Sequence, residues 1–336
     1  MGVSRAAAAK PALVEGISAK ARLHVVTGKG GTGKTTVAAA LALALAETGR
    51  KVLLAEVESR QAMAQLFDTP AMPYQEQRLT GTANGGELFG LAIDPEQAMI
   101  DYLEMFYGLK RSARGLRKMG AVDFVTTLAP GLRDVLLTGK VKEATVRTAD
   151  GSPYYDAVVL DAPPTGRIAR FLDATQEVAK LTKFGPIAKQ SEGVIALLHG
   201  AKTRVHLVTL LEEMPVQETL DAAAELASLG FRLGSVVVNR ARPTLIGPDQ
   251  IGADGQVDLQ LLAAGLREAR LPDGHAPALA AEMAEYAQRQ RVQHENAERL
   301  DALDLPRVEL PDLNPPVQLG ELKDLAARFL ADGERS

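Results

Sequence analysis

Nine residues near the start of the chain combine four glycines, two lysines and three threonines, and positions 28 to 36 read GKGGTGKTT. The run satisfies the pattern G-x-x-x-x-G-K-[ST] of a phosphate-binding loop, in which backbone N–H groups curl around phosphate oxygens and glycines permit the tight curl. In such a loop Lys34 reaches the β- and γ-phosphates, and the hydroxyl of Thr35 ligates Mg²⁺. The run therefore predicts a nucleoside triphosphate and Mg²⁺ as ligands. The residues expected to contact the nucleotide here are Gly28, Lys29, Gly30, Gly31, Thr32, Gly33, Lys34, Thr35 and Thr36.

The same glycines also satisfy the dinucleotide fingerprint G-x-G-x-x-G, and Glu56 or Glu58 lies at about the distance expected of a ribose-binding acid. Lys34 and Thr35 decide between the two interpretations. A dinucleotide turn contacts pyrophosphate through backbone amides and has no use for a lysine at this position. A triphosphate with Mg²⁺ needs both the lysine and the hydroxyl, so the pattern favours the triphosphate.

A phosphate-binding loop needs a strand before it and a helix after it, and the sequence indicates both. Residues 23–26 form a short apolar run of strand type, and residues 37–46 (VAAALALALA) favour a helix that is wholly apolar and therefore buried. Farther along, the apolar run 155–160 predicts another buried strand, and Asp161 follows it at once. An acid in this position, downstream of a phosphate loop, is the arrangement that holds Mg²⁺ directly or through water.

The composition narrows the class of protein. The chain has 336 residues, 46% of them hydrophobic, a formal net charge of −4 and no cysteine. The hydrophobic share suffices for a core, and the net charge does not indicate a nucleic-acid binder. Without cysteine the chain has no disulfides, thiolate metal sites or cysteine nucleophiles. Because it lacks a membrane-spanning apolar run and a secretion signal, the sequence predicts a cytoplasmic protein with no integral membrane segment.

Apolar strand-like runs alternate with helical runs along the chain. This predicts an α/β fold with a doubly wound, mostly parallel sheet of the P-loop NTPase type and an inserted helical subdomain. Residues 1–20 are expected to be a flexible tail, and residues 21–336 a single P-loop ATPase domain. Within it, residues 95–150 are predicted as the helical insertion and residues 243–304 as an irregular segment followed by helices. Residues 68–86 read as loop.

The helical insertion carries an apolar stripe from Met99 to Leu132 that has two interpretations. At helical spacing such a stripe is typical of a core face, and it also fits a partly exposed groove for an apolar client helix. The basic cluster between Lys110 and Lys118 is typical of a solvated helix face, with an acidic partner or lipid headgroups as the alternative.

Lys29 marks a resemblance to a particular class of phosphate loop. Residues 29–36 resemble the deviant Walker A motif with a signature lysine, which occurs in arsenical-pump ATPases, Get-type targeting ATPases, Min and Par ATPases and nitrogenase iron protein. In that class the additional lysine crosses a dimer interface to the partner's nucleotide. The resemblance implies that Lys29 acts in trans and neutralises transition-state charge, much as an arginine finger does.

Within this class the chain looks most like the anion-transporting branch of arsenical-pump and Get-type ATPases, particularly its actinobacterial members, over about residues 21–330. Residues 161–170 (DAPPTGRIAR) are similar to that branch's switch II, D-T-A-P-T-G-H-T-L-R, and residues 130–134 (PGLRD) to its P-G-[ILV]-D-E segment. The resemblance implies that the triphosphate is ATP, that Asn239, followed by Arg240, contacts adenine, and that Pro311 lies near the nucleotide. The switch II residues expected at the nucleotide are Pro164, Thr165 and Gly166, with Asp161 on Mg²⁺.

Two departures from the branch affect what the chain can do. Its switch I reads D-P-A-H-S, whereas this chain has ESRQA from residue 58, so Glu58 takes the place of the water-positioning aspartate. A carboxylate one methylene longer can still orient water, but its different reach leaves the turnover rate open. The lack of cysteine excludes both the arsenite-binding thiolates of the pump ATPases and the interfacial CxxC zinc site of the Get-type dimers.

These features predict a Mg²⁺-dependent ATPase of the arsenical-pump and Get-like family, in which Lys29, Lys34 and Glu58 carry the catalysis. The expected form is a nucleotide-gated dimer with a copy of itself or a paralogous subunit, coupling hydrolysis to a client. One alternative is a targeting or chaperone module that binds apolar helices of membrane proteins. The other, a positioning ATPase of Min or Par type, is disfavoured because the closing segment 319–330 carries mixed charge.

Overall fold

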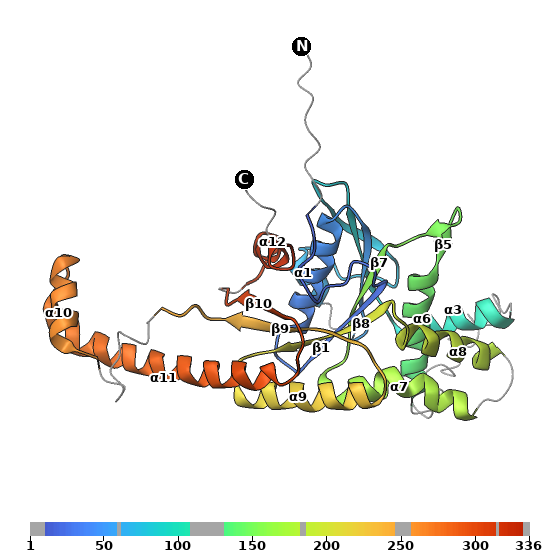
Figure 1. The fold of residues 1–336 in the computed structure, drawn as a ribbon. Helices are drawn as coiled ribbons and strands as arrows, with labels where there is room; N and C mark the ends of the chain where they lie inside the picture. Colours follow the sequence, from blue (N-terminus) through green and yellow to red (C-terminus); the bar gives the residue numbers. More distant parts are fainter. Residues whose placement is uncertain are drawn as a thin grey trace, which may run out of the picture.

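The computed structural model describes residues 11–58, 62–107, 131–181, 186–245, 257–313 and 316–331. Its centre is an eight-stranded sheet with the order β10-β9-β8-β1-β7-β2-β4-β3 (Figure 1). Neighbouring strands in this sheet are parallel apart from the pair β3 and β4, which confirms the predicted mostly parallel α/β fold. The strands are β1 (Leu23–Gly28), β2 (Lys51–Glu56), β3 (Gln77–Gly81), β4 (Glu87–Ala92), β7 (Ala157–Asp161), β8 (Thr203–Thr209), β9 (Leu233–Ala241) and β10 (Arg307–Pro311), with a separate short pair β5 (Thr148–Ala149) and β6 (Ser152–Pro153).

Helices cover both faces of the sheet, as a doubly wound fold requires. One face carries α1 (Lys34–Glu47), α2 (Ala62–Leu66) and α12 (Leu319–Ala327). The other carries α3 (Pro95–Tyr107), α6 (Leu132–Val146), α7 (Thr165–Leu181), α8 (Pro186–Leu198), α9 (Glu213–Ser228) and the end of α11 (Ala276–Asp301).

Helix α1 confirms the prediction of a buried helix after the glycine loop. Residues 37–46 are all at most 1% exposed, because α1 lies between the sheet and α12. A helix that is apolar on every side must be covered on every side. This burial fixes the direction in which the N-terminus of α1 points, and that N-terminus carries the candidate phosphate loop.

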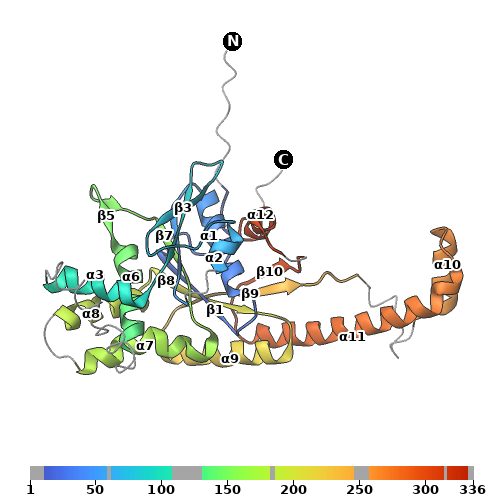
Figure 2. The same ribbon diagram turned by 180° about the vertical axis from the view of Figure 1, so that it is seen from behind.

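A helical group forms at one end of the sheet, where α6 contacts α3, α7 and α8 (Figures 1 and 2). Two of these helices come from the predicted insertion 95–150, while α7 and α8 follow β7, so the group draws on more of the chain than that range. Met99, on the predicted apolar stripe, packs against the core, which agrees with the core interpretation at that position. The basic cluster 110–118 lies outside the described residues.

The helices predicted in the later part of segment 243–304 are confirmed as α10 (Leu259–Glu268) and α11, joined by a 3₁₀ turn at Asp273–His275. Together they project from the body of the molecule as an arm (Figures 1 and 2). None of the described helices combines the length and apolar character that a bilayer-spanning segment requires.

Two segments differ from the expectation of irregular chain. The segment predicted as loop at 68–86 contains the edge strand β3, whose sequence QRLTG has little apolar alternation. It forms a strand because the neighbouring strand β4 supplies backbone partners. Residues 11–20 of the predicted tail lie against the closing helix region, where Leu13 forms a bridge with Leu330 and Ile17 is 4% exposed.

Two buried histidines connect three central strands. His24 on β1 and His206 on β8 stack with ring centroids 5.3 Å apart, and Nδ1 of His24 lies 3.0 Å from Nε2 of His206. Nδ1 of His206 lies 2.9 Å from Oγ of Ser235 on β9. Burial lowers the pKa of His206 to about 3, and burial together with the nearby His206 lowers the pKa of His24 well below its usual value. Both rings are therefore neutral in the folded protein near pH 7.

We expect this histidine pair to make the fold sensitive to acid. In the unfolded chain a histidine takes up a proton near pH 6.5, while in the folded chain it stays neutral, so stability falls as the pH drops below 6.5. Between pH 7 and pH 5 the loss is about 2 kcal/mol for His206, with a loss of the same sign from His24. Chemical denaturation at both pH values will show a smaller pH-dependent loss in the double variant His24→Asn/His206→Asn than in the wild type. The control is His294→Asn, at a side chain that is 76% exposed, and it should keep the wild-type loss.

Candidate nucleotide-binding and hydrolysis site

The glycine loop joins β1 to α1 at the carboxyl edge of the sheet, where β1 lies between β8 and β7. A Cβ on Gly28 would lie 2.2 Å from the carbonyl oxygen of Val208, so only glycine lets β8 approach this closely. Gly31 and Gly33 have φ angles of 90° and 86°, in the left-handed region that glycine adopts without strain. The predicted glycines therefore give the loop the tight curl that phosphate binding requires.

The loop leads into the N-terminus of α1 in a form suited to an anion. Thr32 holds the curl, since its hydroxyl donates a hydrogen bond to the carbonyl of Lys29 across 2.8 Å. Gly33 is the N-cap of α1 and provides no side-chain cap. The first N–H groups of α1 and its dipole can therefore serve an anionic ligand. Lys34, the first residue of the helix, is 9% exposed.

Asp161 ends β7 beside the start of α1, as predicted. The hydroxyl of Thr35 donates to Oδ2 of Asp161 across 2.6 Å. The strand pairing fixes this geometry, because Val26 on β1 and Glu56 on β2 are both in register with Asp161. Switch II is also tied to β1, since Thr27 donates its hydroxyl proton to the carbonyl of Pro163 across 2.7 Å.

The residues present fit a Mg²⁺ ion. Oδ1 of Asp161 is buried and has no hydrogen-bond partner among the described residues, which leaves one carboxylate oxygen available as a ligand. Burial, and to a lesser degree the nearby Glu56 and Glu58, raise the pKa of Asp161 to about 7, against the opposing effects of Thr35 and Lys34. A cation at this position would stabilise the charged form of Asp161 and so offset the unfavourable effect of burial. Nowhere in the described ranges do three His, Asp or Glu side chains gather as a ligand cluster, at Asp161 or elsewhere. Mg²⁺ does not require one, because it commonly takes one or two carboxylates plus substrate phosphates.

A cavity of about 240 Å³ opens next to the loop and gathers predicted residues from three separate parts of the chain. Apolar walls from the β10–α12 region face polar groups from the loop and from the end of β9, a combination suited to a flat heterocyclic base. Its lining residues are Gly31, Gly33, Thr36, Asn239, Arg240, Pro311, Leu313, Val317 and Leu325.

Asn239 connects β9 to the loop as well as lining this cavity. Its Nδ2 donates to the carbonyl of Thr32 across 2.8 Å, and a Cβ on Gly33 would lie 2.3 Å from the same nitrogen. The side chain is thus already fixed against the phosphate loop. The contact with adenine stays a prediction.

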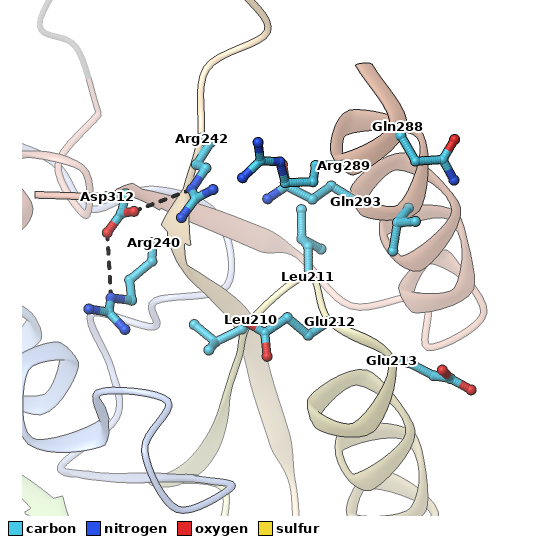
Figure 3. Close-up of a pocket in the computed structure, with 11 residues that line it drawn as sticks. Leu210, Leu211, Glu212, Glu213, Arg240, Arg242, Gln288, Arg289, Gln293 and Asp312 are labelled. Atoms are coloured by element: carbon cyan, nitrogen blue, oxygen red, sulfur yellow. Dashed lines mark hydrogen bonds and ion pairs between the residues drawn. The ribbon is translucent and has the colours of Figure 1, made fainter. Parts of the chain in front are cut away.

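Arg240 follows at the end of β9 and borders a second, larger cavity of about 430 Å³ on the side of α11 (Figure 3). Its φ of 54° is unusual for a residue with a side chain. Asp312 forms ion pairs with both arginines of this strand end. Its Oδ1 lies 3.4 Å from Nε of Arg240, and its Oδ2 lies 3.4 Å from Nε of Arg242. Arg240 lines both cavities.

Lys29 lies at the surface of the loop and reaches α9. Its Nζ lies 2.7 Å from Oε1 of Glu218, while the hydroxyl of Thr165 donates to Oε2 of the same carboxylate across 3.2 Å. Glu218 therefore connects the loop lysine to the first residue of α7, in switch II. Sequence reasoning missed Glu218, because a single acid inside an amphipathic helix gives no signal of its own.

Glu58 lies just beyond β2, close enough to Asp161 to raise its pKa. An arginine from switch II stands between it and the helical group. Nη1 of Arg167 lies 3.9 Å from Oε1 of Glu58, and Nη2 lies 3.6 Å from Oδ1 of Asp134 in the first turn of α6. Arg167 and Asp134 belong to the two segments that carry the resemblance, yet neither had been predicted as a site residue.

Most of the predicted residues fall into three neighbouring groups at this edge. Lys34, Thr35 and Asp161 lie at the start of α1, and Pro164, Thr165 and Gly166 lead from β7 into α7. The predicted residues that line the base cavity are Gly31, Gly33, Thr36, Asn239, Arg240 and Pro311. Gly30 lies at the outer bend of the loop, with no described atom within 4 Å of where its Cβ would be. Residues 59–61 of the predicted switch I and residue 130 lie outside the described residues.

Asp161→Asn tests both the metal site and the strain it imposes. We expect Mg²⁺-dependent affinity for ATP to fall by about tenfold or more, because the amide supplies no charge to the ion. We also expect the nucleotide-free protein to become more stable at pH 8, on the order of 1 kcal/mol, because the buried charge is removed while Thr35 keeps an acceptor. Titration calorimetry and chemical denaturation measure the two effects. Asp324→Asn, at an exposed position on α12, is the control and should change neither.

Comparison with known proteins agrees with this geometry. The family model for anion-transporting ATPases matches residues 21–200, which is more than half of the chain. The chain is 54% identical over 319 residues to ATPase BagA of Mycobacterium tuberculosis, covering 94% of both proteins. It is 30% identical over 239 residues to an arsenical pump-driving ATPase of Escherichia coli, a match that spans 65% of this chain and 39% of that protein. The chain therefore belongs to the anion-transporting ATPase family.

Proposed function

We propose that this ATPase binds Mg²⁺-ATP at the β1–α1 loop and works as a nucleotide-gated dimer, with a second copy or a paralogous subunit as the partner. The observation that carries the proposal is the coincidence of three features at one edge of the sheet. These are the anion-ready start of α1, the Thr35–Asp161 pair with its available carboxylate oxygen, and the base cavity beside them.

Each group has a defined task in this proposal. Backbone amides of the loop and Lys34 bind the phosphates, and Thr35 with Asp161 holds Mg²⁺, which when bound neutralises charge on the phosphate oxygens. The base lies in the cavity against Pro311 and the apolar side chains beyond it. Glu58 orients the water that attacks the terminal phosphate and holds its proton.

We assign Lys29 to the nucleotide of the second subunit. In the structure it forms an ion pair with an acid of its own chain. Its Nζ pairs with Oε1 of Glu218 on α9 at 2.7 Å. The pair is about one third exposed, so water screens it and a better anion can replace Glu218. A nucleotide on a second subunit facing this loop offers that anion. When Lys29 exchanges Glu218 for the nucleotide of the second subunit, the new ion pair stabilises the closed dimer in the presence of ATP.

We also propose that the dimer couples hydrolysis to a client. Most of the region where the sequence predicts a client groove, residues 108–130, lies outside the described residues. A Min- or Par-like role has less support, because the closing helix α12 buries Leu322, Leu325 and Ala326 in the core cluster around α1. Its apolar face is thus occupied.

Lys29→Ala tests action in trans. We expect the rate of ATP hydrolysis to fall by about a thousandfold with ATP affinity largely retained, because the lysine acts on transition-state charge. Mixing Lys29→Ala subunits with Lys34→Ala subunits should restore hydrolysis, since the mixed dimer contains one complete site. Lys202→Ala, at an exposed lysine, is the control. An unchanged rate in Lys29→Ala, or mixed subunits that stay inactive although they associate, would contradict the trans role.

Glu58→Gln tests the assignment of the water-orienting group. The amide keeps the shape and cannot take a proton, so we expect hydrolysis to slow by about a hundredfold or more while Mg²⁺-ATP still binds. Rapid-quench measurement of a single turnover isolates the chemical step. Glu192→Gln, at an exposed glutamate of α8, should behave as the wild type. Wild-type single-turnover kinetics in Glu58→Gln would assign the role to another group.

A further inference from the structure

The geometry points to Arg167 as a positioning residue that holds Glu58 for hydrolysis and passes the nucleotide state of the site to helix α6 through Asp134. This inference rests on the proposed function, and it concerns three residues that come from three separate segments. Arg167 lies in the first turn of α7, Glu58 just beyond β2, and Asp134 in the first turn of α6.

The two distances make Arg167 a shared partner. At 3.9 Å from Glu58 and 3.6 Å from Asp134, the guanidinium is within ion-pair range of both carboxylates and at hydrogen-bond distance from neither. A planar guanidinium forms its strongest contact with one carboxylate, through two parallel hydrogen bonds. A small shift toward either acid would therefore strengthen one pair and break the other, which gives two distinct arrangements.

Burial makes the choice of arrangement matter. The side chains of Glu58 and Asp134 are only 19% and 18% exposed, whereas Arg167 is 52% exposed and lies over both. Oδ1 of Asp134 is buried and makes no hydrogen bond to any described residue. Burial raises the pKa of this carboxyl, and Arg167 and Arg133 oppose the rise. Loss of Arg167 would leave Asp134 with poorer compensation.

The backbone ties Arg167 to the nucleotide site. Its N–H donates to the carbonyl of Pro164 across 2.8 Å, and the side chain of Thr165 contacts Glu218, the partner of Lys29. A change in the β7–α7 link that accompanies nucleotide binding must therefore move Arg167. The side chain then settles on Glu58 or on Asp134.

Helix α6 is built to respond to such a change. Its N-cap, Gly131, has a φ of 87° and makes no side-chain cap bond, so the first turn depends on Asp134 near the positive end of the helix dipole. Forming or breaking the ion pair between Arg167 and Asp134 therefore alters the stability of the first turn of α6. Because α6 contacts α3, α7 and α8, its start is a route from the site into the helical group.

These three positions are among those where this chain departs from the motifs it resembles. Glu58 stands where switch I has aspartate, Arg167 where switch II has histidine, and Asp134 where the P-G-[ILV]-D-E segment has glutamate. Glu58 is one methylene longer than the aspartate of the motif, and it is the acid that reaches Arg167 from the end of β2. The three changes thus fit one ion-pair arrangement.

Three measurements on the wild type and four variants test this inference. The rate of ATP hydrolysis and the affinity for a non-hydrolysable ATP analogue with Mg²⁺ are measured together with amide hydrogen exchange in residues 132–146, with and without the analogue. The proteins are wild type, Arg167→Ala, Arg167→Lys, Asp134→Asn and the control Arg78→Ala. The control removes an arginine of similar exposure, 56%, from its ion pair with Glu87, and Arg78 lies on the edge strand β3.

We expect Arg167→Ala to hydrolyse ATP about ten to a hundredfold more slowly with analogue affinity changed by less than about threefold, since misplacement of a catalytic group acts on the rate. Its α6 exchange should no longer respond to the analogue. Asp134→Asn should keep at least the wild-type rate and lose the α6 response, because Arg167 then serves Glu58 alone. Arg167→Lys, which keeps the charge without the fork, should fall between the wild type and Arg167→Ala.

Wild-type hydrolysis in Arg167→Ala, or an α6 response that persists in this variant, would overturn the inference while leaving the ATPase proposal intact. A wild-type protein that neither binds the analogue with Mg²⁺ nor hydrolyses ATP, alone or with a paralogous subunit, would overturn both. An Arg78→Ala control as slow as Arg167→Ala would also count against it, because a general loss of stability would then explain both variants.

Discussion

The interaction on which the site depends is a carboxylate held between parallel strands and the start of a buried helix. Asp161 is 7% exposed, and one of its oxygens accepts from Thr35 while the other remains without a hydrogen bond among the described residues. Burial of an acid disfavours its charge, so this position costs stability in the absence of a cation. A fold keeps such a group only where the ligand state recovers that cost.

The parallel sheet makes this arrangement geometrically unavoidable. Because β1, β2, β7 and β8 run in the same direction, their carboxyl ends meet at one edge, and side chains far apart in the sequence become neighbours there. Gly28 allows β8 to come against β1, and Asn239 bonds the loop from β9. The wholly buried α1 then holds its N-terminus at the same edge. Packing on both faces of the sheet thus positions the groups that face the phosphates.

Sequence patterns predicted the parts of this molecule that local physics specifies. The glycine loop, the apolar run of α1 and the acid after an apolar strand are all read within a few residues, and all lie where expected. The strand β3 was missed because its pairing comes from β4 and not from its own pattern. Glu218 and Arg167 were missed for the same kind of reason, since their partners are brought close only by the packing of α9, α7 and α6.

The placement of charge around the loop explains why these missed residues matter. Lys29 and Arg167 are cations close to switch II, and each is paired with an acid from another element at a partly exposed position. Pairs of this kind are weak in water and are easily exchanged for a more highly charged anion. A triphosphate with four negative charges at neutral pH would compete for both cations, and Mg²⁺ would compete for Asp161. Bound nucleotide can therefore replace the ion pairs of Lys29 and Arg167 by its charge alone, and the packed core beneath them stays folded.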